Sequence, residues 1–226
     1  MTLVLLVRHG RSSANSAGIL AGRMPGVHLD DTGREQAAEI GARLAGVPVS
    51  EVVTSPLERC RETAKGLVAA LDGRPAIRAD KRFVEVDYGD WTGKKLSTLA
   101  KRSLWRVVQQ QPSAARFPGG ESLAEVAARA ALGTRAVVER LGGPGSKKVV
   151  VVVSHGDVIK SILADALGLH LDLFQRIVVD PGAVSAIRYT QERPYVLAVN
   201  SHAGSLGVGA KPPRGSQSPV GGTTGR

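Results

Sequence analysis

The chain begins with an apolar run that ends abruptly in two polar residues and a glycine, Leu3-Val4-Leu5-Leu6-Val7-Arg8-His9-Gly10. A continuous Leu/Val run of this length is typical of a strand that is buried on both faces of a parallel sheet. Ligands of open α/β sheets bind at the carboxyl ends of such strands. Arg8 and His9 are therefore expected at the rim of the sheet, either as part of a site or simply as the polar end of a strand.

The same pattern returns in the second half of the chain. A valine-rich run over residues 148–153 ends in Ser154-His155-Gly156, and a segment with helical periodicity continues to about Leu167. Because the carboxyl ends of parallel strands meet at one edge of a sheet, two such strands bring their histidines to that edge. The repetition favours a functional site that contains both His9 and His155.

Composition limits the kind of protein. The chain has 226 residues, of which 42% are apolar, enough for one sizeable core. No apolar run approaches membrane-spanning length, and the N-terminal run is too short for the core of a signal peptide. The single cysteine, Cys60, rules out an intramolecular disulfide and fits a reducing compartment, where it is interpreted as a small buried residue. We therefore expect a cytoplasmic protein with no membrane partner.

The charge of the chain points to an anionic partner. The formal net charge is +10 and the pI is about 10.3, which suits a nucleic acid, an anionic membrane or a phosphorylated small molecule. The basic residues are spread along the chain, and an aromatic content of 4% offers few stacking platforms for single-stranded nucleic acid. No CxxC or HExxH spacing occurs. We expect a phosphorylated small molecule as partner, and neither a nucleic acid, a metal nor a cofactor.

Between and after the two histidine-bearing strands, the sequence alternates predicted strands and helices, which indicates an α/β protein. Thr32 is expected to cap the first long helix, and Ser55 with Pro56 to start the second. Further strands are predicted at residues 51–54, 76–79, 183–190 and 194–200, and helices at 32–44, 56–71, 96–110 and 122–141.

The chain is expected to form one domain over residues 1–203. Residues 204–226 are rich in Gly, Ser and Pro and lack periodicity, so they are predicted to be a disordered tail.

Two further segments offer chemistry at the same rim. Arg59 falls in the first turn of the second helix, where it either faces the rim or remains a solvated helix arginine. The loop over residues 82–93 carries three acids, and either Glu85 or Asp87 is a candidate proton donor.

Taken together, these residues make the chain resemble the histidine phosphatase superfamily, also called the phosphoglycerate mutase-like family. The resemblance covers about residues 3–202, nearly all of the chain except the tail. Any one of its motifs is weak, but four of them occur in the right order. They are Arg8-His9-Gly10 with Ser12 and Asn15, Ser55-Pro56-Leu57 with Arg59 and Thr63-Ala64, Glu85 before Gly89 and Trp91-Thr92-Gly93, and Ser154-His155-Gly156.

The resemblance implies a three-layer α/β/α sandwich around a mostly parallel sheet, with a helical cap inserted between Glu85 and His155. It also implies catalytic roles. His9 is the nucleophile that becomes a phosphohistidine, and Glu85 first donates a proton and then activates water. Donors and positive charge around the transferred phosphoryl group come from Arg8, Arg59 and His155. Substrate contacts are expected from Asn15, Gly156, Ala21, Gly22 and Arg23.

Three functions follow, in order of preference. The first is a metal-independent phosphatase that acts on a small phosphorylated metabolite. The second is a phosphomutase, which Arg11 disfavours because glycolytic mutases of the family typically carry Glu after Arg-His-Gly. Such mutases also have a longer insertion before the second histidine. The third is a non-catalytic module that binds a phosphorylated ligand. The sequence leaves the substrate and the oligomeric state open, a homodimer included.

Overall fold

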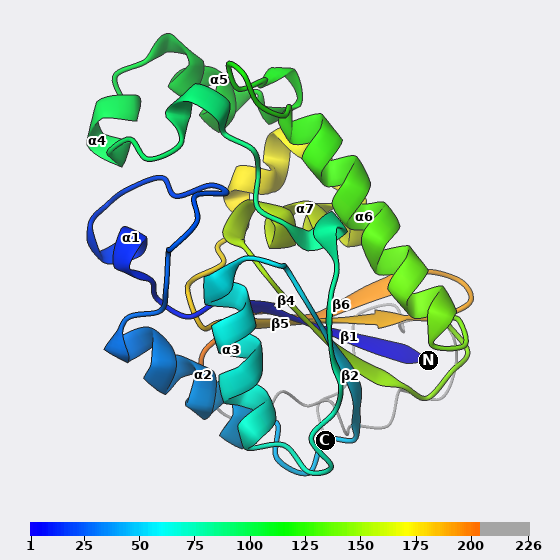
Figure 1. The fold of residues 1–226 in the computed structure, drawn as a ribbon. Helices are drawn as coiled ribbons and strands as arrows, with labels where there is room; N and C mark the ends of the chain where they lie inside the picture. The colour runs from blue at the N-terminus through cyan, green and yellow to red at the C-terminus, as the bar shows by residue number, and fades with distance from the viewer. Residues whose placement is uncertain (204–226) are drawn as a thin grey trace.

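The structure is a computed structural model that describes residues 1–203. Its centre is a six-stranded sheet in the order β3-β2-β4-β1-β5-β6 (Figure 1). The first four strands of this order are parallel to one another, β5 runs antiparallel to β1, and β6 runs antiparallel to β5. In chain order the strands are β1 (Thr2–Arg8), β2 (Val49–Thr54), β3 (Ile77–Ala79), β4 (Val149–Ser154), β5 (Val184–Tyr189) and β6 (Pro194–Ser201).

Every predicted strand is present with its ends shifted by no more than two residues. Helices cover both faces of the sheet (Figure 1). They are α1 (Ser13–Ser16), α2 (Asp31–Arg43), α3 (Glu58–Ala69), α4 (Leu96–Leu99), α5 (Ser103–Gln110), α6 (Leu123–Arg140) and α7 (Gly156–Leu167).

The apolar run of β1 divides between two cores, because successive side chains of a strand point to opposite faces. Val4 and Leu6 belong to the core beneath α6 and α7, whereas Leu3, Leu5 and Val7 belong to the core beneath α2 and α3. β4 divides in the same way. Both central strands are thus buried on both faces, as their unbroken apolar runs predict. The predicted three-layer α/β/α sandwich is confirmed.

Two helix starts differ from the prediction because the expected capping hydroxyls are engaged elsewhere. α2 is capped by Asp30, whose carboxylate accepts from the Gly33 amide at 2.9 Å, while the Thr32 hydroxyl accepts from Arg11. α3 begins at Glu58 rather than Pro56, and the Ser55 hydroxyl lies 2.8 Å from His155 Nε2. The start of α6 is as predicted at Ser122, which forms a capping box with Glu125.

The helix predicted over residues 96–110 is two helices, α4 and α5. The break lets Leu99 enter the core while Trp105 stacks on Trp91 with ring centroids 6.3 Å apart. These elements form the cap, which lies at the top of Figure 1 above the loop that carries α1. The sequence prediction for residues 204–226 falls outside the described part of the chain. No helix within residues 1–203 has the length and apolar character needed to cross a bilayer.

Candidate active site

The register of the two central strands brings the two histidines together. Arg8 of β1 lies opposite Ser154 of β4, so His9 and His155 follow at the same edge of the sheet. The His9 amide donates to the Ser154 carbonyl at 3.0 Å, and the two imidazole rings meet edge to face with centroids 5.2 Å apart. Both rings are almost completely buried.

The hydrogen bonds of His9 define which of its nitrogens carries the lone pair. Nδ1 lies 2.7 Å from the Gly10 carbonyl, which can only accept, so Nδ1 carries the proton. Nε2 is therefore unprotonated, and Arg59 Nε donates to it at 3.3 Å. Burial, followed by the charges of Arg59 and Arg8, holds the pKa of His9 well below its usual value. His9 is thus a neutral imidazole with its lone pair at Nε2.

Two arginines at the same rim, Arg59 buried and Arg8 half-buried, have buried donor atoms without a partner. Arg59, from the first turn of α3, donates to the Gly22 carbonyl at 2.8 Å, but its Nη1 has no partner. Arg8 donates to the Val179 carbonyl at 2.6 Å, and its Nε is likewise buried without a partner. Leaving a buried donor unsatisfied costs free energy. Both side chains line the cavity at the rim of the sheet, so the unused donors suit an anionic ligand there.

His155 is held by the neighbouring strand and helix. Arg59 Nη2 lies 3.2 Å from His155 Nδ1, and because arginine only donates, Nδ1 carries the lone pair and Nε2 donates to Ser55 at 2.8 Å. Burial and then the Arg59 charge hold the pKa of His155 well below its usual value. Gly156 opens α7 and lines the cavity, where a helix N-terminus presents free amides to an anion.

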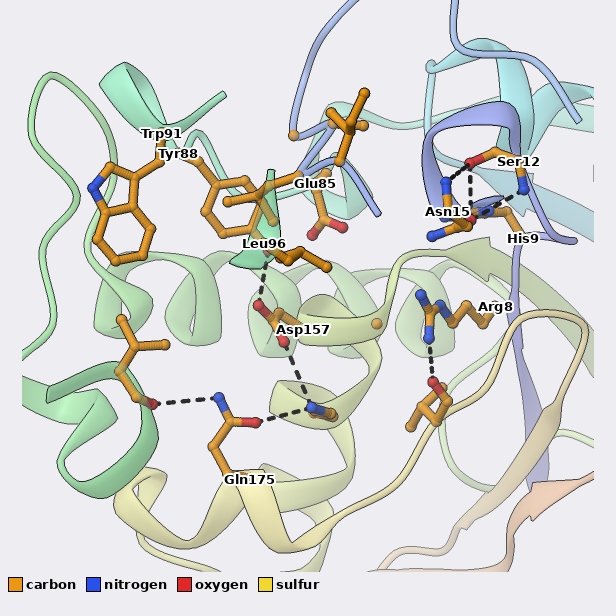
Figure 2. A pocket seen from close by; sticks show the side chains of 18 of the residues that line it. Arg8, His9, Ser12, Asn15, Glu85, Tyr88, Trp91, Leu96, Asp157 and Gln175 are labelled. Atoms are coloured by element: carbon orange, nitrogen blue, oxygen red, sulfur yellow. Dashed lines mark hydrogen bonds and ion pairs between the residues drawn. The ribbon is translucent and has the colours of Figure 1, made fainter. Parts of the chain in front are cut away.

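Glu85 is the carboxyl that faces the histidines. It is buried, its Oε2 lies 3.8 Å from His155 Nδ1, and Figure 2 shows the carboxylate directed into the cavity. Burial, followed by the charge of Asp157, raises the pKa of Glu85 to about 7. A carboxyl with a pKa near neutrality can both donate and accept a proton at physiological pH. Asp87 instead bonds the Gly89 amide and approaches Arg23, away from this group.

The predicted substrate contacts divide into two groups. Ala21, Gly22 and Asn15 line the cavity. The Asn15 side-chain oxygen accepts from the amide and the hydroxyl of Ser12, so the side-chain nitrogen of Asn15 points away from Ser12. Arg23 does not line the cavity. Its Nε donates to the Glu85 carbonyl at 2.9 Å and its Nη2 pairs with Glu121 at 2.8 Å, so its guanidinium is held by the Glu85 backbone and by Glu121.

Gly10 has a structural reason to be glycine. The neighbour that requires glycine there is the backbone of Gly33, whose carbonyl oxygen would lie 2.3 Å from an added Cβ.

The whole cavity has a volume of about 420 Å³. Several of the residues that line it were not predicted from the sequence. Asp157 could have been predicted as a site residue, because it directly follows the His155-Gly156 motif. No sequence pattern singles out its hydrogen-bond partner Tyr88. Tyr88 donates to Asp157 at 2.8 Å across the cavity wall (Figure 2). The other lining residues missed from the sequence come from the cap and from the segment after α7; among them are Trp91, Leu96, Trp105, Lys160 and Gln175.

Cys60 is confirmed as a small buried residue. Its Sγ lies 3.4 Å from His155 Nε2, and burial raises the pKa of the thiol to about 12, so it remains protonated. Within the described residues, no group of three or more His, Cys, Asp or Glu side chains is arranged to hold a metal ion.

The fold and the site together define an α/β protein with two paired histidines and two arginines at the carboxyl edge of its sheet. Residues 4–202 match the family model of the histidine phosphatase superfamily, branch 1. The chain therefore belongs to this superfamily and is an enzyme of it, as its four motifs predict.

Individual relatives agree with this assignment. The chain is 28% identical over 214 residues to phosphoserine phosphatase 1 of Hydrogenobacter thermophilus, which covers 93% of this chain and 98% of that protein. It is 32% identical over 173 residues to glucosyl-3-phosphoglycerate phosphatase of Mycolicibacterium vanbaalenii, covering 75% and 76%. Among solved structures, Bacillus stearothermophilus YhfR superposes with a TM-score of 0.81 at 25% identity, covering 91% of this chain and 100% of that one.

Proposed function

We propose that this protein hydrolyses phosphomonoesters of small molecules through a phosphohistidine formed at His9. The observation that carries the proposal is the pair of buried, unpartnered donors, Arg8 Nε and Arg59 Nη1, in the cavity that also contains the lone pair of His9 Nε2. Phosphoryl transfer depends mainly on positioning and on charge placed around the equatorial oxygens. Planar guanidinium groups suit those oxygens better than ammonium groups do.

The first half of the reaction makes the phosphohistidine. His9 Nε2 attacks phosphorus in line, a nitrogen–phosphorus bond forms, and the bond from phosphorus to the alcohol oxygen breaks. The Glu85 carboxyl gives its proton to the departing alkoxide and becomes a carboxylate. The positive charge around the phosphoryl oxygens comes from the unpartnered donors of Arg8 and Arg59.

The second half regenerates the enzyme. The Glu85 carboxylate takes a proton from a water molecule, whose oxygen attacks phosphorus as the nitrogen–phosphorus bond breaks. Inorganic phosphate leaves, His9 Nε2 recovers its lone pair, and Glu85 is protonated again. The pKa of Glu85 near 7 supports both roles within one turnover.

The test is release of inorganic phosphate from p-nitrophenyl phosphate and from a panel of alkyl phosphates, with EDTA present throughout. Wild type is compared with His9→Ala and with His170→Ala, a matched change at an exposed histidine. We expect turnover that is lost in His9→Ala, retained in His170→Ala and unaffected by EDTA. An acid-labile phosphoryl label is expected on wild type and on His170→Ala, but not on His9→Ala.

Two results would redirect the proposal. A label at His9 without release of phosphate would favour a phosphomutase, which returns the group to a second hydroxyl. A folded wild type that neither releases phosphate nor becomes labelled would favour a module that only binds phosphorylated ligands.

A further inference from the structure

The cavity extends well beyond the space that a phosphoryl group needs. Its volume of about 420 Å³ falls within the range of about 300–1,000 Å³ that is common for sites of whole small molecules. Figure 2 shows Trp91 at the opposite end of the cavity from Arg8 and His9. We call the end that contains Trp91, Leu96, Trp105 and Val108 the outer half, because it is built by the cap.

The outer half has a rigid aromatic wall. Trp91 stacks on Trp105 with an interplanar angle of 19°, and Phe117 meets the Trp91 ring edge to face with centroids 5.3 Å apart. Trp91 and Phe117 are buried, so these rings are held in place before a ligand arrives. Leu96 lines the same cavity although 38% of its surface is exposed. Apolar side chains that line a cavity and remain accessible to solvent indicate an apolar ligand surface.

The charges of the outer half are balanced without a ligand. Apart from Arg8 and Arg59, the cation among the described lining residues is Lys160. Its Nζ donates to Gln175 at 3.0 Å and lies 3.8 Å from the Asp157 carboxylate. Besides Glu85 and Asp157, the cavity is lined by a third acid, Asp180, which follows the Val179 carbonyl that accepts from Arg8. A negatively charged group on the leaving alcohol would find no surplus positive charge here and would face Asp157.

Arg23, the arginine that the sequence analysis expected to contact the substrate, binds two acidic side chains instead. Arg23 pairs with Glu121 at 2.8 Å and lies 3.6 Å from Asp87, outside the cavity lining. Bringing it to the substrate would break this pairing and release the Glu85 carbonyl. A binding site often discriminates against a ligand by leaving its charged group without a partner, as well as by making contacts to the preferred ligand.

We propose, on the basis of the phosphatase function above, that the outer half selects phosphomonoesters of uncharged, ring-bearing alcohols over those with a second anionic group. Phosphoserine and phosphoglycerate carry a carboxylate beside the phosphoester, so they are poor substrates of this chain. An apolar ring packs against Trp105 and Leu96 while the phosphoryl group reaches His9.

The experiment compares three primary alkyl phosphates with similar leaving groups: propyl, 3-phenylpropyl and 3-carboxypropyl phosphate. We expect kcat/KM to be about 10- to 100-fold higher for the phenyl ester than for the propyl ester, from burial of one ring. The carboxyl ester is expected to be the poorest of the three. Equal values, or a preference for the carboxyl ester, would overturn the proposal while leaving the phosphatase function intact.

Two variants probe the outer half directly. Trp105→Ala is expected to reduce the ratio of phenyl ester to propyl ester toward one. Leu96→Lys places a new cation at an accessible position and is expected to raise the relative kcat/KM of the carboxyl ester. Leu132→Lys is the matched control, because Leu132 is exposed on α6 and does not line this cavity. A Leu96→Lys variant with the specificity of Leu132→Lys would contradict the proposed position of the leaving group.

The outcomes also separate this inference from the proposed function. If none of the three esters is hydrolysed, the phosphatase function fails. Dissociation constants of the esters, measured by calorimetry, then decide the inference by their order, because the phenyl ester must still bind more tightly than the carboxyl ester.

Discussion

The backbone carbonyl of Glu85 accepts a hydrogen bond from the Arg23 guanidinium at 2.9 Å. Arg129 of α6 donates to the same carbonyl at 3.2 Å, and the Glu121 carboxylate pairs with both arginines, at 2.8 and 3.0 Å. Three segments far apart in the sequence thus hold the backbone of the candidate proton donor. We therefore assign Glu121 as a positioning residue that acts through Arg23 and Arg129.

Replacing Glu121 with glutamine is expected to lower kcat while changing KM little. The substitution removes the charge that holds both arginines, so the Glu85 carboxyl loses its alignment with the leaving oxygen. Misplacement of a catalytic group by about 1 Å can cost about 100-fold in rate. The measurement is steady-state kinetics with an alkyl phosphate.

Glu125→Gln is the matched control for this change. Glu125 pairs with Arg116 at the surface, and glutamine can still complete the capping box with Ser122. A similar loss of kcat in both variants, or a change in KM alone, would contradict a positioning role for Glu121.

Arg59→Lys is expected to reduce kcat by about 100- to 1,000-fold, the usual effect of removing one donor aimed at developing charge. Lysine keeps the positive charge but cannot donate to His9 Nε2 and the Gly22 carbonyl together while leaving a nitrogen free for phosphate. Arg61→Lys, two residues along α3, serves as the control. Near-normal phosphate release by Arg59→Lys would show that charge alone, without the planar fork, suffices.

The pH dependence of kcat/KM is expected to show a basic limb set by Glu85. With a pKa of about 7, the carboxyl holds its proton below that pH and loses it above, so turnover of an alkyl phosphate falls as the pH rises past 7. The pKa of His9 is well below its usual value, so His9 stays neutral across this range and adds no acid limb near 6.5.

Asp157→Asn should move that basic limb to lower pH. The charge of Asp157 is the second cause, after burial, that raises the pKa of Glu85, so its removal lets the proton leave more easily. Asp165→Asn, on the same helix but paired with Arg135, is expected to leave the limb in place. A profile that shifts equally in both variants would argue against Glu85 as the titrating group.

Gly33→Ala is expected to destabilise the protein and to disturb the loop that follows His9. An added Cβ would lie 2.0 Å from the Arg11 carbonyl oxygen, so the two backbones must separate. Overpacking of this kind costs about 1–3 kcal/mol. Urea denaturation measures the loss, with Gly145→Ala as control because the nearest atom there is 3.7 Å away. Equal stability of the two variants would show that the loop yields without cost.

Local sequence patterns predicted most of the secondary structure because the burial of a strand and the capping of a helix depend on residues that are close together in the sequence. The apolar run of β1 is buried on both faces, and Ser122 with Glu125 starts α6 as a capping box must. Thr32 and Ser55 misled the prediction because a hydroxyl before a helix can serve another partner. In this fold those partners are Arg11 and His155, which no local pattern identifies.

The sequence by itself determined the order of strands and helices along the chain, and its motifs determined the family. It also placed His9 and His155 at one edge of the sheet, because each follows an apolar run that is typical of a buried strand. Only the tertiary structure decided that Glu85 rather than Asp87 faces the histidines, and that Arg23 donates to the backbone carbonyl of Glu85. It also decided that Asp157 adjusts the proton affinity of Glu85. These features depend on burial and on charges brought together from distant segments, and such electrostatic effects arise only once the chain has folded.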